Sequence, residues 1–118
     1  INLHSSANLN NHLTNMAQYV AEVPEDGALK KGIASFFESF YAVSDPAEAH
    51  EQYADHFTSD AKLVMASKEA NGRDGIIGMR HGMWEKVAKR SHTVNKIYSF
   101  GKDSYDVMLH GTVDYELK

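Results

Sequence analysis

Apolar residues recur at helical spacing through the first half of the chain. The strongest series lies between residues 28 and 43 and predicts an amphipathic helix with one broad apolar face, made of Leu29, Ile33, Phe36, Phe37 and Phe40. A weaker series predicts a preceding helix over residues 6–22, which Pro24 and Gly27 end. A third helix is expected from Pro46 to about residue 57, with Asp45 as its N-cap.

The second half of the chain changes between strand and helix patterns. Residues 61–66 predict a short strand, and Asn71-Gly72 is typical of a tight turn. Asp74 is expected to cap a helix over residues 75–89, whose inner face carries Ile77, His81, Trp84 and Ala88. Residues 92–100 and 104–117 predict two strands joined by a hairpin loop. This order of elements indicates an α+β fold, with helices on one face of a sheet.

Simple alternation assigns the faces of the two long strands. His92 is expected to point toward the core near the sheet edge, where pocket mouths lie, on one face with Val94, Lys96, Tyr98 and Phe100. In the last strand, the odd-numbered residues of 105–117 are expected inside and His110 outside. Gly111 leaves an alternative open, because a bulge there would reverse the parity and turn Asp114 inward as a candidate carboxylate base.

Composition narrows the classes of protein to which the chain can belong. Its 118 residues are enough for one domain with a real core, and the absence of cysteine excludes disulfide frameworks, iron–sulfur clusters and cysteine nucleophiles. A net charge of -4 argues against nucleic-acid binding, and no apolar run approaches the ~20 residues that span a bilayer. We therefore expect neither nucleic acid nor membrane as a partner. No signal-peptide pattern follows Ile1, which favours a cytoplasmic location.

The histidines are the first candidates for chemistry, and one group superficially resembles a metalloprotease helix. His50-Glu51 starts such a motif, but the second histidine of HExxH would have to stand where Ala54 stands. The two-ligand helix face is therefore missing, and we expect no metal site. The segment Gly72-Arg73-Asp74-Gly75 also lacks the spacing and the lysine of a phosphate-binding loop, and we expect no cofactor.

Two histidines and two tyrosines remain as candidates for a pocket. His81, on an apolar helical stripe, and His92 can each be a core histidine that is hydrogen-bonded to its surroundings, or an acid or base that lines a pocket. Tyr41 and Tyr53 lie near the ends of apolar helical faces. Each can be an amphipathic core residue with a wet hydroxyl, or a donor to a carbonyl or enolate oxygen.

Four stretches carry a resemblance to a known family: SFFESFYAVSD, AHEQYADHFTSDAKLVMA, NGRDGIIGMRHGMWEKV and SHTVNKIYSFG…YDVMLHGTVDYEL. Their order resembles the nuclear transport factor 2-like superfamily, and within it the SnoaL-like small proteins, including fungal ones. The resemblance covers residues 28–118 and leaves 1–27 as an N-terminal helical extension. It implies a cone, in which a strongly bent antiparallel sheet wraps the helices around a deep, mostly apolar pocket. Such domains normally have two further strands after the one that ends at Leu117.

The resemblance implies a cofactor-independent cyclase, isomerase or lyase that performs acid–base chemistry on a small apolar or polyketide-like ligand. The alternative is a non-catalytic domain of the same fold, for ligand binding or dimerisation. The candidate catalytic residues are His81, His92, Tyr53 and Asp114. The candidate ligand-binding residues are Phe36, Phe40, Tyr41, Met65, Trp84 and Tyr98. A homodimer is expected, because the convex sheet face and the open strand edge need cover.

Overall fold

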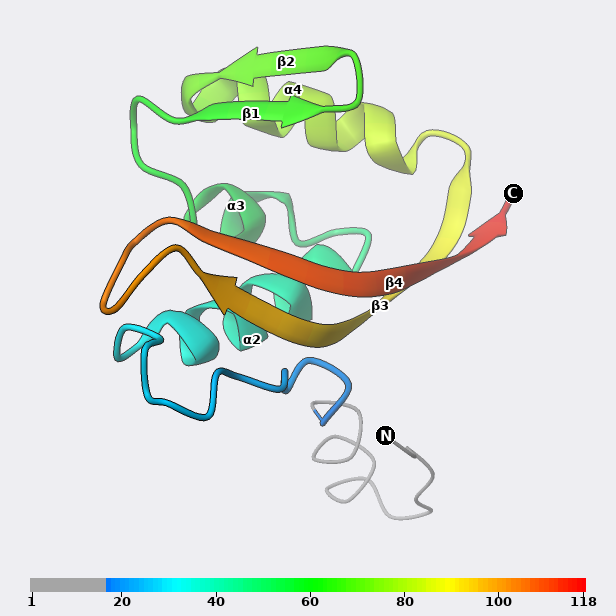
Figure 1. The fold of residues 1–118 in the computed structure, drawn as a ribbon. Helices are drawn as coiled ribbons and strands as arrows, with labels where there is room; N and C mark the ends of the chain where they lie inside the picture. The colour runs from blue at the N-terminus through cyan, green and yellow to red at the C-terminus, as the bar shows by residue number, and fades with distance from the viewer. Residues whose placement is uncertain (1–16) are drawn as a thin grey trace. The chain divides into compact units, whose positions relative to one another are not determined.

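The computed structural model describes residues 17–118, which are coloured in Figure 1. Within this range the elements follow in the order α2 (Ile33–Ser44), α3 (His50–Ala54), β1 (Lys62–Met65), β2 (Lys68–Asn71), α4 (Gly72–Trp84), β3 (Val87–Ser99) and β4 (Val107–Leu117). The fold is α+β, as the sequence predicts. Most of the helix expected over residues 6–22 lies outside the described residues. Among the described residues, no helix has the length and apolar character needed to cross a membrane.

The chain divides into two compact units, which are described separately. The first unit contains the residues up to 42 together with 91–114, and the second contains 43–90 together with 115–118. Three elements, α2, β3 and β4, run from one unit into the other.

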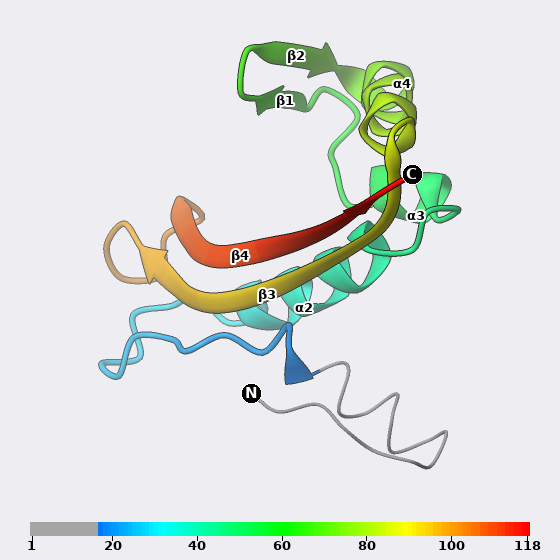
Figure 2. The ribbon, with the colours of Figure 1, turned by 90° about the vertical axis from the view of Figure 1, so that its right-hand side faces the viewer.

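A two-stranded antiparallel ribbon is the centre of the first unit. β3 and β4 run side by side, as Figures 1 and 2 both show. The segment before α2 adds to β3 through backbone hydrogen bonds: the amide of Glu22 donates to the carbonyl of Asn95 over 2.8 Å, and the amide of Ile97 donates back to Glu22 over 3.0 Å. Among the described residues of this unit, the buried apolar side chains are Tyr19, Val94 and Ile97.

The burial pattern along β3 differs from simple alternation. Val94 and Ile97 are both buried, so the buried face changes between them, next to the backbone bridge from Glu22 to Lys96. Tyr98 and Phe100 are consequently exposed, although the sequence places them on the inner face.

Alternation holds next to Gly111 in β4, but Tyr105, Tyr115 and Leu117 are exposed, although the sequence places them on the inner face. Leu109 and Val113 are half-buried, whereas His110 and Asp114 are exposed. The parity therefore does not reverse at Gly111, and the inward carboxylate that a bulge would have produced is not found.

The second unit begins its sheet with a hairpin that the sequence shows only in part. β1 pairs with β2 in a register that sets Met65 opposite Lys68, and the turn lies at Ala66, whose φ is 53°. Because the sequence of β2 is mostly polar, the hydrophobic pattern does not predict a strand there. Asn71-Gly72 is therefore not the turn but the start of α4, where Gly72 has a φ of 70° and donates its amide to the carbonyl of Ala61 over 2.8 Å.

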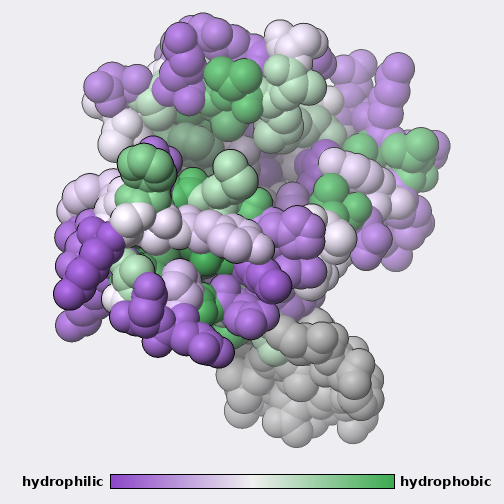
Figure 3. Space-filling view, viewed as in Figure 1, coloured by the Kyte–Doolittle hydropathy of each residue, from purple (hydrophilic) through white to green (hydrophobic). Residues whose placement is uncertain are grey.

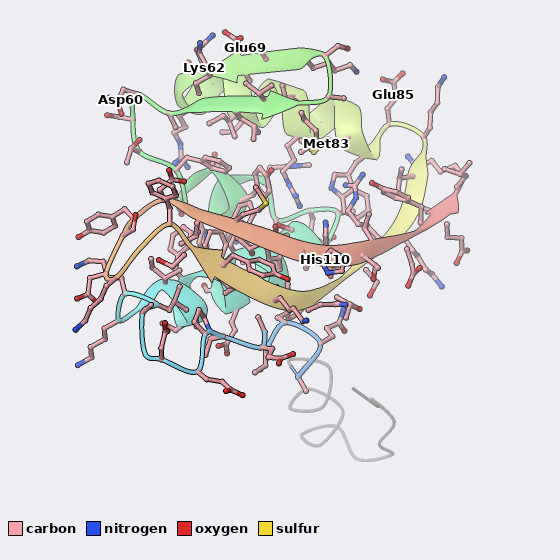
Figure 4. The ribbon with its side chains drawn as sticks, viewed as in Figure 1. Asp60, Lys62, Glu69, Met83, Glu85 and His110 are labelled. Atoms are coloured by element: carbon pink, nitrogen blue, oxygen red, sulfur yellow. The ribbon has the colours of Figure 1, made fainter. Side chains whose placement is uncertain are left out.

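The solvent face of this hairpin is mixed in character. Figure 4 shows Lys62 and Glu69 close together, and their charged atoms are 3.6 Å apart. Apolar side chains are interspersed among polar ones over the hairpin in Figure 3, and Val64 and Met65 are exposed. Met65 therefore faces solvent, contrary to its expected place in a ligand pocket.

The helices of the second unit differ from the prediction in length and phase. α3 has only five residues, because Pro46 lies in a turn and its carbonyl accepts a hydrogen bond from Arg80. On α4 the buried residues are Ile76, Arg80 and Trp84, and each follows the one before it by four positions. The buried stripe is thus displaced from the predicted one, and His81 is exposed. α4 ends at Trp84, and residues 87–90 belong to β3 instead of a helix reaching residue 89.

Candidate functional site

The first unit holds a cavity of about 230 Å³. Tyr41 of α2 lines it together with three consecutive residues of β3, His92, Thr93 and Val94. Residues 109–113 of β4 complete the lining, and His110 is labelled on that strand in Figure 4. The cavity thus joins two of the residues that the sequence nominates for a pocket, Tyr41 and His92.

Tyr41 and His92 contact each other through their rings. The ring centroids are 4.9 Å apart and the planes are tilted by 48°. Tyr41 also contacts Phe40 and Phe37 on its own helix, with centroid distances of 5.1 and 6.4 Å. The ring of Tyr41 therefore contacts the aromatic series of α2 as well as the imidazole of His92.

Burial raises the pKa of the Tyr41 hydroxyl above its ordinary value of 10.0. At neutral pH the hydroxyl consequently keeps its proton and can donate a hydrogen bond to an acceptor in the cavity.

This pKa shift can be checked by alkaline titration. Because the folded-state pKa lies above the unfolded value, Tyr41 stabilises the fold below pH 10 and this contribution is lost as the pH rises through the raised pKa. We expect the absorbance change near 295 nm to contain a phase with its midpoint above pH 10.0. Tyr41→Phe should remove this phase. An unchanged phase above pH 10.0 in Tyr41→Phe would contradict the assignment.

The backbone at His92 is held by a side chain from the segment before α2. The amide nitrogen Nε2 of Gln18 donates to the carbonyl of His92 over 2.5 Å and to Oγ of Ser91 over 2.9 Å. The amide of Val94 donates to the carbonyl of Gln18 over 2.9 Å. This clamp fixes the strand that carries the imidazole, which is a group able to accept and return a proton near neutral pH.

Gly111 lets β4 approach β3 closely at the cavity. A Cβ atom at this position would lie 2.3 Å from the carbonyl oxygen of Thr93 and 3.2 Å from Cα of Val94. The glycine is therefore required by space, and not by a bulge or by a left-handed backbone.

The lining chemistry suits a neutral ligand. Val94, Leu109 and Val113 supply apolar surface, and the polar groups are hydroxyls and imidazoles. Among the described residues that line the cavity, none is Asp, Glu, Lys or Arg. A charged ligand would find no opposite charge there, and its desolvation would be uncompensated.

The other ligand-binding candidates of the first unit lie outside this lining. Phe36 and Phe40 stack on each other along α2, with centroids 6.4 Å apart, and Phe36 is 42% exposed. Tyr98 is 51% exposed, beyond the point where the buried face of β3 changes. Of the predicted catalytic residues, the first unit brings only His92 to the cavity.

Three further candidates, Tyr53, His81 and Trp84, belong to the second unit, and two of them, Tyr53 and Trp84, contact Arg80. This arginine is 1% exposed, and its guanidinium carbon lies 4.6 Å from the ring centroid of Tyr53 and 5.7 Å from that of Trp84. Arg90 lies over the same indole at 4.5 Å. The buried Nε1 of Trp84 has no hydrogen-bond partner among the described residues.

The guanidinium of Arg80 binds three backbone carbonyls. Its nitrogens donate to the carbonyls of Ser44 over 3.1 Å, Val43 over 3.3 Å and Pro46 over 2.5 Å. Two of these carbonyls end α2, where a helix leaves its last carbonyls without intrahelical partners and presents partial negative charge. Burial is the main cause that lowers the pKa of Arg80, which still remains charged at any physiological pH.

His81 lies beside a second histidine that the sequence does not nominate for a pocket. The ring centroids of His81 and His50 are 4.0 Å apart, and Nε of Arg80 donates to Nδ1 of His50 over 3.1 Å. In the part of the chain that the structure describes, no three His, Asp or Glu side chains are placed to hold a metal ion.

The roles of Arg80 and Gly111 could not be predicted from local sequence patterns. Arg80 stands four residues from both Ile76 and Trp84, so its place on the buried stripe is visible in the spacing, but arginine normally indicates a surface position. The need for Gly111 arises from a carbonyl on another strand, which no local pattern contains.

Comparison with known proteins assigns the chain to no family. No family model matches the chain, and no curated protein or solved structure matches it significantly. A function for this chain must therefore be inferred from the chemistry of its own residues.

Proposed function

We propose that the chain is a small pocket protein that performs cofactor-independent acid–base chemistry on a neutral, apolar or polyketide-like ligand. The observation that carries this proposal is the contact between Tyr41 and His92 at the wall of an uncharged cavity whose lining is partly apolar and partly polar. Proton transfer at the carbon next to a carbonyl group needs at least a general base and a hydrogen-bond donor to the carbonyl oxygen.

The proposed step uses the two side chains in different roles. The neutral imidazole of His92 takes a proton from the carbon next to the ligand's carbonyl, and the electron pair of that C–H bond moves into an enolate. The hydroxyl of Tyr41 donates a hydrogen bond to the developing oxyanion, and its raised pKa keeps the proton on the tyrosine. The imidazolium then returns the proton to the enolate, which restores the neutral site.

The size of the cavity limits the ligand to a small molecule. Its volume of about 230 Å³ is below the ~300–1,000 Å³ of drug-sized ligand pockets. One or two fused rings with a single carbonyl group fit this volume and the uncharged lining.

A nuclear transport factor 2-like fold of the SnoaL-like kind is part of the proposal. It is supported by the order of the elements, in which α2 and α3 precede a short hairpin, α4 and the long β3–β4 ribbon. A homodimer belongs to the same proposal, since within the described residues β4 pairs with β3 alone and keeps one unpaired edge.

Hydrogen–deuterium exchange of a probe ketone tests the proposed chemistry. We expect the protein to accelerate deuterium uptake at the carbon beside the carbonyl of 1-tetralone in D₂O, measured by NMR. His92→Gln should lower this acceleration about 100-fold, which is the usual contribution of a general base. His56→Gln is the control, because His56 does not line this cavity.

The outcomes separate the proposal from its alternative. Equal exchange rates in His92→Gln and wild type would reject His92 as the base. Binding of 1-tetralone without any acceleration would favour a non-catalytic ligand-binding domain. His81, Tyr53 and Asp114 have no part in the proposed step, since none of them lines this cavity.

A further inference from the structure

The second unit contains a hydrogen bond that can exist in only one protonation state. Nε of Arg80 donates to Nδ1 of His50 over 3.1 Å. An arginine nitrogen can only donate, so Nδ1 of His50 must carry a lone pair and the His50 proton must be on Nε2. His50 is consequently neutral whenever this bond is formed.

Protonation of His50 would convert this attraction into a repulsion. A proton on Nδ1 would point at the guanidinium, and the two cationic groups would face each other over about the present distance of 3.1 Å. The ring of His81, on α4, also contacts the ring of His50, and the two centroids are 4.0 Å apart. His81 adds positive charge beside His50 when it is protonated.

The acids near His50 oppose this effect only in part. Glu48 precedes α3 and Glu51 lies within it, and both act to raise the pKa of His50. Glu51, however, is bound to Arg73 at 2.7 Å and is thereby partly neutralised. Burial, followed by His81 and Arg80, outweighs the acids and lowers the pKa of His50 below its ordinary value of 6.5.

Further charged groups face Arg80 from the elements around it. Asp45 and Glu48 favour its charge from the turn before α3, and Arg90 of β3 opposes it. The ring of Tyr53, on α3, lies 4.6 Å from the guanidinium carbon, and Tyr53 also acts to raise the pKa of Arg80. The guanidinium of Arg80 donates to the carbonyls of Val43, Ser44 and Pro46 and to His50.

We propose that His50 and Arg80 form a pH-sensitive latch, which holds the end of α2 and the start of α3 against α4 while His50 is neutral and releases them when His50 is protonated. The same guanidinium binds the carbonyls of Val43, Ser44 and Pro46, so a displacement of Arg80 removes the donors of all three. The latch lies in the second unit and does not depend on the function proposed for the Tyr41–His92 cavity.

The pH range of the latch follows from the direction of the shift. Because the folded state holds the His50 proton less tightly than the unfolded state, the latch stabilises the fold fully above pH 6.5. This contribution is lost as the pH falls below 6.5 through the lowered pKa. The opening equilibrium of residues 43–54 is expected to rise roughly tenfold for each unit by which the folded-state pKa lies below 6.5.

NMR of ¹⁵N-labelled protein tests the latch directly. At pH 7.5 we expect the long-range ¹H–¹⁵N spectrum to show Nδ1 of His50 unprotonated and Nε2 protonated, and titration toward pH 5 should give a midpoint below 6.5. Backbone amides of residues 43–54 should lose protection from hydrogen exchange in step with that titration, after correction for intrinsic rates. A protonated Nδ1 at pH 7.5, or a midpoint at or above 6.5, would overturn the proposal.

Two variants make the test specific. His50→Asn keeps an acceptor close to the position of Nδ1 but cannot titrate, so residues 43–54 should keep their protection down to pH 5. His56→Asn is the matched control, because Nδ1 of His56 contacts the carbonyl of Gln52 and not Arg80, and it should retain the wild-type pH response. The same loss of protection in His50→Asn as in wild type would contradict the latch. If His50→Asn does not fold, the wild-type titration alone decides.

Discussion

Replacement of Arg80 by methionine is expected to lower the free energy of unfolding by at least ~3 kcal/mol, the largest effect of any single substitution considered for this chain. The side chain is 1% exposed and holds the carbonyls of Val43, Ser44 and Pro46. Methionine fills similar space but donates nothing, so the three acceptors lose their donor. Each buried unsatisfied polar group costs about 1–3 kcal/mol.

Urea unfolding of Arg80→Met and Arg73→Met separates burial from charge. Arg73 forms ion pairs with Glu51 at 2.7 Å and Asp55 at 2.8 Å, which are shorter contacts than most of those made by Arg80. Its side chain is nevertheless 45% exposed, and exposed ion pairs contribute little to stability because water and salt screen them. Equal losses in the two variants would show that Arg80 is not the buried support that its contacts indicate.

Replacement of Gly111 by alanine is expected to cost about 2–3 kcal/mol and to abolish ligand binding in the cavity. The new Cβ would lie 2.3 Å from the carbonyl oxygen of Thr93, a backbone atom that cannot move aside without displacing β3. Both glycine and carbonyl border the cavity, so the two strands would separate where Tyr41 and His92 meet.

Gly78→Ala is the matched control for this substitution. Gly78 lies within α4, and a Cβ there meets nothing within 4 Å. Alanine favours the helix over glycine by about 1 kcal/mol, so this variant should be as stable as wild type or more so. Thermal unfolding of both variants gives the comparison, and a Gly111→Ala protein as stable as Gly78→Ala would contradict the close approach of the strands.

The elements with strong periodicity could be predicted from the sequence, whereas their ends and phases could not. The aromatic series predicts α2, but the helix begins only at Ile33 because Gly32 has a φ of 93°. The buried stripe of α4 contains Arg80, which binds carbonyls contributed by a distant part of the chain. A prediction from the sequence pattern places the buried stripe on apolar residues. It therefore predicts that His81 points inward, whereas His81 is exposed in the structure.

The candidate site shows the same limit. The sequence predicts Tyr41 and His92 beside apolar surface, and the structure places them in contact at one cavity. Their contact depends on two interactions between distant segments, the Gln18 clamp on the His92 backbone and the approach of Gly111 to Thr93. Tyr98 fails as a candidate because the added segment at Glu22 accompanies a change in the buried face of β3.

Titration of the ¹⁵N-labelled protein with 1-tetralone tests the central claim most directly, since it asks whether a neutral small molecule enters the Tyr41–His92 cavity. We expect saturable shifts of the backbone amides of His92, Val94 and residues 109–113, together with the ring resonances of Tyr41. The same titration with benzoate should give no such shifts, because the lining carries no lysine or arginine. Shifts confined to residues outside the lining, or none at saturating ketone, would contradict the account.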